Sequence, residues 1–290
     1  MCFNLLSLAA LCCGAAVCCA AAEREQPEDG GISVSLYQWE TRKFQWEKPP
    51  SGHMQFAVHL NVRNGASLKV AYCEEDRAVL RIRDAGGRSC SGLQYQYFSS
   101  AAMPGSRKTG VFTVLTKSWL PSPSATWFQV EGTIPFAVSR TSAMSEFVVL
   151  RQDEGEGVPL VLRGAAMDGG DVEVRMKINE DMSWKSGGKE HRRFSIRLDS
   201  PVRIGCMGFE VHMEDGMLLP QDERDRMMMK TGDGYAWRRP LAPENLTGKE
   251  WRVSVKYAAG LERILVPVDI RGGLFGVAEE REPVKKGGLK

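Results

Sequence analysis

The 290-residue sequence has little net charge, because 38 lysine and arginine residues against 36 aspartate and glutamate residues leave only +2 at pH 7. A chain this close to neutral produces no overall field that attracts nucleic acid or anionic lipid. We therefore expect no nucleic-acid partner, and we expect membrane contact only through the N-terminal segment, if that segment is not cleaved.

Recognisable catalytic motifs are also missing. The sequence has no GxSxG, HExxH, Walker or dinucleotide-binding motif. Residues 186–189 match the SxxK pattern, but such short matches arise often by chance, and this one falls in a predicted loop. The sequence therefore predicts no catalytic residue and no cofactor, which favours a protein that is not an enzyme. An enzyme whose site is assembled from distant residues stays open, since such a site leaves no local motif.

Helical periodicity is scarce, and most apolar residues alternate with polar ones. Period-two alternation is typical of strands with one buried face. Many short strands separated by Gly- and Pro-rich turns indicate a sandwich or barrel. The alternating stretches are residues 32–36, 56–62, 68–72, 128–138, 160–162, 172–178, 194–198, 209–213, 251–257 and 264–270.

The order of these stretches repeats after about 115 to 132 residues, with an acidic, Gly-containing linker between the copies. The sequence therefore predicts an all-β fold of two tandem immunoglobulin-like β-sandwich units, residues 27–152 and residues 158–275, after an N-terminal export signal. Residues 276–290 are charged and poor in apolar side chains, and we expect a disordered tail there.

Three chain reversals are predicted. Asn64-Gly65 lies between two alternating runs, which is the strongest short signal for a hairpin. Residues 250–270 are predicted to form a second hairpin, turning at Ala258-Ala259-Gly260. In the second unit, a loop of about twelve residues that contains Trp184 is predicted to join residues 172–178 to residues 194–198.

The first 22 residues are apolar, carry no charged side chain and end in three alanines. This pattern fits a signal peptide with small residues at the cleavage point, so we expect a periplasmic, envelope-associated or extracellular location. The run has no Lys or Arg near its start and is just long enough for a membrane anchor, and its cysteines leave lipid attachment open.

Five of the eight cysteines lie in that leader, which leaves Cys73, Cys90 and Cys206. In an oxidising compartment a disulfide between Cys73 and Cys90 is possible. No Cys/His spacing indicates zinc, and no metal site is predicted. A soft-metal site near Cys206 and His212 is the alternative to methionines that simply pack the core.

The favoured function is a secreted or cell-envelope, non-catalytic protein that binds or scaffolds a protein or polysaccharide partner through sandwich loops or strand edges. The alternative is a carbohydrate-binding accessory protein that uses loop aromatics. Its candidate ligand-binding residues are Trp184, Tyr235, Trp237 and Arg238.

Overall fold

A computed structural model describes residues 31–43, 54–65, 68–99, 109–152, 155–187, 189–219, 227–232, 234–241 and 250–274. These residues form eighteen β-strands and one short 3-10 turn, Glu75–Arg77, with no α-helix among them. The all-β prediction is therefore confirmed. We find among them no helix with the length and hydrophobicity that a membrane crossing requires. The leader, residues 1–22, and the predicted tail, residues 276–290, lie outside the described part of the chain.

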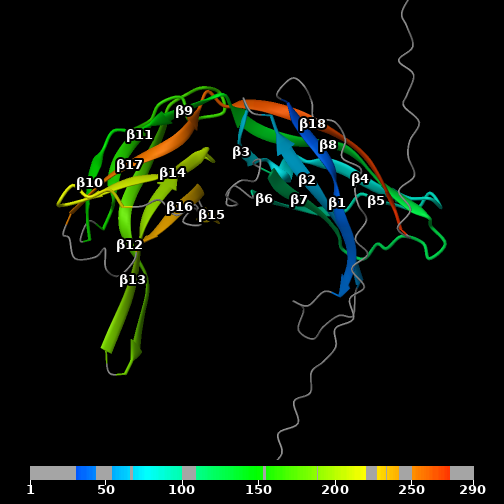
Figure 1. The fold of residues 1–290 in the computed structure, drawn as a ribbon, viewed down its shortest axis with the longest axis horizontal. Coiled ribbons are helices and arrows are strands. Elements are labelled where there is room, and N and C mark those ends of the chain that lie inside the picture. The colour runs from blue at the N-terminus through cyan, green and yellow to red at the C-terminus, as the bar shows by residue number, and fades with distance from the viewer. Residues whose placement is uncertain are drawn as a thin grey trace, which may run out of the picture.

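The first sandwich, on the right in Figure 1, packs two antiparallel sheets around one core. Its largest fully buried side chains are the aromatic rings of Phe56, Phe112, Phe128 and Phe136. All but Phe112 lie in stretches that the sequence predicts as strands with a buried face. One sheet has the order β1 (Ile32–Lys43), β2 (Met54–Asn64), β7 (Thr109–Thr116), β6 (Leu93–Ser99). The other has the order β18 (Glu262–Gly273), β8 (Trp127–Ser139), β4 (Val79–Asp84), β5 (Ser89–Cys90), with β3 (Lys69–Cys73) also beside β8.

The second sandwich has a separate core. One of its sheets has the order β11 (Val158–Leu162), β12 (Val172–Ser186), β13 (Lys189–Ser200), β16 (Gly234–Leu241), β15 (Met227–Thr231). The other has the order β10 (Val148–Arg151), β17 (Glu250–Ala259), β14 (Cys206–Met213), with β9 (Thr141–Met144) also beside β17.

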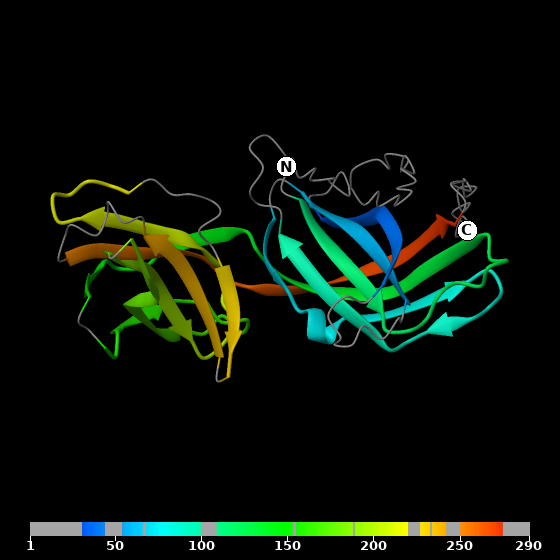
Figure 2. The same cartoon turned by 90° about the horizontal axis from the view of Figure 1, so that it is seen from below.

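A single two-stranded ribbon runs through both sandwiches. Pairing of β8 with β18 extends from Trp127 opposite Gly273 to Val138 opposite Glu262. Only Arg140 separates β8 from β9, and β9 then pairs with β17, as β10 does further along. In Figure 2 the orange-to-red end of the chain passes from one lobe into the other as β17 followed by β18. The two sandwiches therefore share one continuous antiparallel ladder.

This ribbon corrects the predicted hairpin at residues 250–270. β17 and β18 do not pair with each other, because each already lies beside a segment of residues 127–151. The glycine expected to reverse the chain, Gly260, has φ +62° and sits where the strand passes between the lobes. The alternation correctly indicates the buried face of each strand, but it does not indicate which strands are neighbours.

The hairpin predicted at Asn64-Gly65 is also wrong. β2 pairs with β1 and β7, whereas β3 pairs with β8 in the opposite sheet. The turn therefore carries the chain from one layer to the other, and the Asn64 side-chain amide donates to the Leu68 carbonyl at 2.7 Å.

Strand pairing does not follow the predicted boundary between residues 152 and 158. β9 and β10 precede that boundary but pair with β17, and β18 follows it but pairs with β8. The ranges 27–152 and 158–275 therefore exchange strands, and the measurement that tests the boundary is whether either range folds by itself.

The three described cysteines are free, so the possible bond between Cys73 and Cys90 is absent from the structure. Cys73 pairs with Phe136 of β8, while Cys90 pairs with Ile82, which pairs with Val130 of β8. Six residues of strand correspond to about 20 Å, and cysteines with Cα atoms more than about 7 Å apart cannot be bridged without moving backbone. Burial raises the pKa of the Cys73 thiol, which makes it a poor nucleophile.

Arg203, between β13 and β14, ties the second sandwich to the first. Its Nη1 donates to the Cys73 carbonyl at 2.6 Å and to the Glu75 carboxylate at 2.9 Å. The guanidinium lies 4.6 Å from the ring centroid of Tyr72, a cation–π distance. At Gly205, an added Cβ would lie only 2.8 Å from the Cβ of Ala71, so this close approach requires glycine.

We expect Trp251→Ala to lower the free energy of unfolding by about 3–5 kcal/mol. Trp251 is 0% exposed and lies in β17, the strand that the ribbon and the second core share. Urea unfolding measures the change, and Lys256→Ala on the exposed face of the same strand is the control, with an expected change below about 0.5 kcal/mol. An unchanged midpoint for Trp251→Ala would contradict the assigned face.

The shared ribbon also predicts which fragments fold. Residues 31–138 joined by Asn-Gly to residues 262–274 keep β18 beside β8, since Val138 and Glu262 are cross-strand partners. We expect this chain to melt cooperatively by circular dichroism and a fragment of residues 27–152 to show no cooperative melt. Cooperative melting of the 27–152 fragment would show that β18 is dispensable.

Candidate functional site

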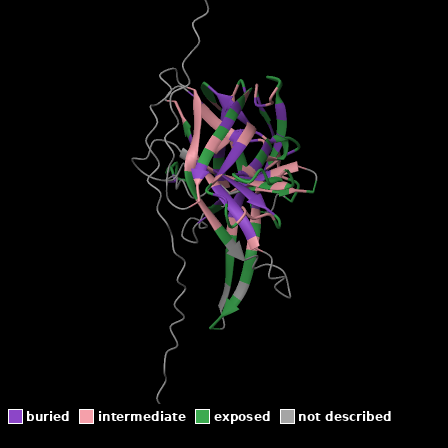
Figure 3. Ribbon diagram, turned by 90° about the vertical axis from the view of Figure 1, so that its right-hand side faces the viewer, coloured by how far each residue is buried: buried purple, intermediate pink, exposed green. Residues whose placement is uncertain are grey.

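The β12–β13 hairpin extends well beyond its sandwich. β11 covers β12 only from Val172 to Met176, and β16 covers β13 only from Phe194 onward. The two strands nevertheless pair with each other as far as Ser186 opposite Lys189. The resulting arm projects downward in Figure 1 and is largely exposed in Figure 3. The segment predicted as a loop of about twelve residues is therefore strand.

Alternation along these strands decides which side chains face outward from the sheet. Val174, Met176 and Ile178 of β12 are buried in the core, as are Ile196 and Leu198 of β13. The residues between them face the other way. The outward set on the three central strands includes Glu173, Arg175, Lys177, Arg193, Arg197, Asp199 and Arg238.

Three of these side chains form a row of like charge across neighbouring strands. Lys177 of β12 lies directly opposite Arg197 of β13, and Arg197 lies directly opposite Arg238 of β16. Directly opposed side chains have Cβ atoms about 4.5–5.5 Å apart, and like charges placed there destabilise a sheet. We call Lys177, Arg197 and Arg238 the cationic row.

The row is only partly neutralised by carboxylates. Arg197 bonds Asp199 at 2.8 Å, and Arg238 bonds Asp181 at 3.1 Å. Lys177 makes no ion pair within the described part of the chain, and the same holds for two flanking exposed arginines, Arg175 and Arg193. The outer face of β12, β13 and β16 therefore has cations without partners, which can bind an anionic group.

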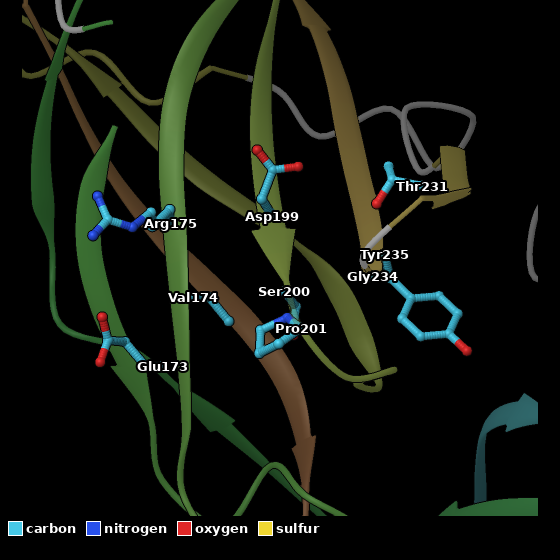
Figure 4. Close-up of a pocket in the computed structure, with 9 residues that line it drawn as sticks. All are labelled: Glu173, Val174, Arg175, Asp199, Ser200, Pro201, Thr231, Gly234 and Tyr235. Atoms are coloured by element: carbon cyan, nitrogen blue, oxygen red, sulfur yellow. The ribbon is translucent and has the colours of Figure 1, made fainter. Parts of the chain in front are cut away.

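A hollow of about 500 Å³ lies at the end of this face. Figure 4 shows Glu173 and Arg175 projecting to one side of β12 and Val174 to the other, with Asp199 on the neighbouring strand. Tyr235 closes the far side, with its ring directed toward the first sandwich. The hollow therefore continues the charged face toward the junction of the two lobes.

A second hollow, of about 480 Å³, lies at that junction and also includes Tyr235. Its charges are largely paired: Arg263 donates to Glu74 at 2.5 and 2.9 Å, and Arg203 is bound as described above. Burial, followed by the nearby Glu74 carboxylate, raises the pKa of Tyr72 in its wall. Internal pairing makes this region a brace between the sandwiches.

The four residues expected to bind sugar are not brought together in one groove. Trp237 is 4% exposed and packs in the second core, because it shares a face with Leu241. Trp184 lies in the arm opposite His191, while Tyr235 pairs with Ser200. His191 and Ser200 are nine residues apart on β13, or about 30 Å.

Arg238 alone lies within the cationic row. Sequence reasoning selected it for its closeness to Tyr235 and Trp237 and missed Lys177 and Arg197, because the row exists only once three strands are in register.

No group of three or more His, Cys, Asp or Glu side chains able to hold a metal ion occurs in the described ranges. His212 lies six residues from Cys206 along β14, or about 20 Å away, and its ring contacts the Glu210 carboxylate at 2.8 Å. Comparison of the chain with protein-family models, with curated proteins and with solved structures found no match.

We expect Lys177→Glu to raise the free energy of unfolding by about 0.5–1 kcal/mol, because it places a carboxylate opposite Arg197 and removes a like-charge contact. The gain should shrink at high salt, which screens exposed charges. Urea unfolding at low and high salt measures it. Lys117→Glu, an equal charge change on an exposed residue of the first sandwich, is the control. A loss of stability in Lys177→Glu would show that Lys177 already has a favourable partner.

Proposed function

We propose that the protein is a secreted or cell-envelope, non-catalytic binding or scaffold protein. Its macromolecular partner lies along the outer face of β12, β13 and β16 and along the β12–β13 arm. The two sandwiches serve in this proposal as immunoglobulin-like units that position the arm, and the apolar leader directs export. The observation that carries the proposal is the arm with its uncovered strand edges, which continues a sheet face that carries Arg175, Lys177 and Arg193, cations unpaired among the described residues.

The arm is difficult to explain as a stabilising element. A two-stranded ribbon is marginally stable by itself and buries little apolar surface. Here it exposes Met182 to 57% and leaves backbone groups of both outer edges uncovered by other described strands. Such edges are templates for pairing with another chain or for contact with a polymer.

Charge on the arm could have served only to prevent aggregation, since lysine and arginine often block edge-to-edge pairing. That role needs charge at an edge. The cationic row instead lies across three adjacent strands, with Arg197 on a strand that has neighbours on both sides. Its position on the sheet face, where like charges oppose one another, favours a role in binding.

The test is a variant in which residues 183–192 are replaced by Asn-Gly. This change joins Met182 to its cross-strand partner Arg193 through a two-residue turn and leaves the sandwich intact. We expect the variant to keep the unfolding free energy within about 0.5 kcal/mol and to co-sediment less than the wild type with surface material prepared from the source cells, because it keeps the cations of the sheet face but loses the arm that the partner also contacts.

The replaced segment carries three cations and one carboxylate. The matched control is therefore Arg81→Gln with Lys117→Gln, which removes the same net charge from exposed positions of the first sandwich. Retention of the arm-shortened variant at the wild-type level would contradict the proposed function, as would an equal loss in the control.

A further inference from the structure

We propose that the partner is an acidic polysaccharide, and that its carboxylate or sulfate groups bind the cationic row together with Arg175 and Arg193. This inference rests on the proposed function, because it names the chemistry of the polymer that the β12–β13 face holds. It follows from the kind, the spacing and the density of the charges on that face.

The kind of cation favours an oxyanion whose two oxygens can accept parallel hydrogen bonds. Four of the five side chains are arginine, whose planar guanidinium binds carboxylate and sulfate through two parallel hydrogen bonds. Asp181 contacts Nη1 of Arg238, while the buried Nε of the same guanidinium has no hydrogen-bond partner in the described structure. Arg175 and Arg193 are exposed and bind nothing among the described residues, so their donors are available to a ligand.

The spacing suits an extended chain. Cations in the row are one strand apart, or about 4.8 Å, and Arg175 and Lys177 are two residues apart, or about 7 Å. Arg193 and Arg197 are four residues apart on β13, or about 13 Å. Together the row, which runs across the strands, and the two flanking arginines, which lie along them, form a patch that extends from the hollow at Glu173 and Asp199 to the base of the arm.

The carboxylates among these cations favour a polymer of low charge density, such as a polysaccharide, over a nucleic acid. Three carboxylates, Glu173, Asp181 and Asp199, lie among the five cations. They would repel duplex DNA, which carries a negative charge for about every 1.7 Å of its axis. A polysaccharide with one anionic group per one or two sugar rings can place its charges on the cations and its uncharged faces on the carboxylates and on exposed Met182.

The experiment measures binding of the full chain by isothermal titration calorimetry to four probes: polygalacturonate, dextran sulfate, unmodified dextran and duplex DNA. We expect binding to polygalacturonate, to dextran sulfate or to both, no binding to dextran and weaker binding to DNA. Binding to only one of the two polyanions identifies the anionic group as a carboxylate or as a sulfate.

Arg175→Gln with Arg193→Gln removes two exposed cations that have no partner among the described residues, so the fold should be unaffected. We expect this variant to bind at least about tenfold more weakly. Arg81→Gln with Lys117→Gln removes the same charge from the first sandwich and should change affinity by less than about twofold.

Equal losses in both variants, tighter binding to DNA, or binding to unmodified dextran would each overturn the inference. If neither polyanion binds while retention on surface material still requires the arm, the partner is not an acidic polysaccharide and the proposed function stands. If retention is also independent of the arm, the proposed function fails as well.

Discussion

The structure depends on the antiparallel pairing of residues 127–151 with residues 250–273. This ladder supplies β8 and β18 to the first sandwich, and β9, β10 and β17 to the second. Its inward side chains belong to both cores, with Phe136 in one and Trp251 in the other. Because the same two chain segments cross the junction side by side, neither sandwich can complete its sheets without a segment that also enters the other.

The ribbon fixes where the candidate surface lies. It occupies one sheet of the second sandwich, so the other sheet, with β12, β13 and β16, faces away from it across the core. Arg203 holds the junction by bonding the Cys73 carbonyl and Glu75. The β12–β13 arm is consequently carried on a second sandwich that is braced against the first.

Sequence alone indicated the strands and their buried faces, but it did not indicate their neighbours. The alternation around Trp251 and around Val266 correctly predicted buried side chains, because period two reports only on the faces of a strand. It failed at Asn64-Gly65 and at Gly260, where a good local turn signal joins different sheets. For the site, it identified Arg238 but grouped it with Trp237, which points into the core, and it missed Lys177, whose significance depends on pairing with Arg197.

The most direct test of the ribbon's role is differential scanning calorimetry of the whole chain. The calorimetric enthalpy of unfolding is compared with the van't Hoff enthalpy. Sandwiches that share one ribbon should unfold together, in a single transition for which the two enthalpies agree. Two separate transitions, or a calorimetric enthalpy near twice the van't Hoff value, would show that the two sandwiches unfold independently in the whole chain and would contradict the central role of the ribbon.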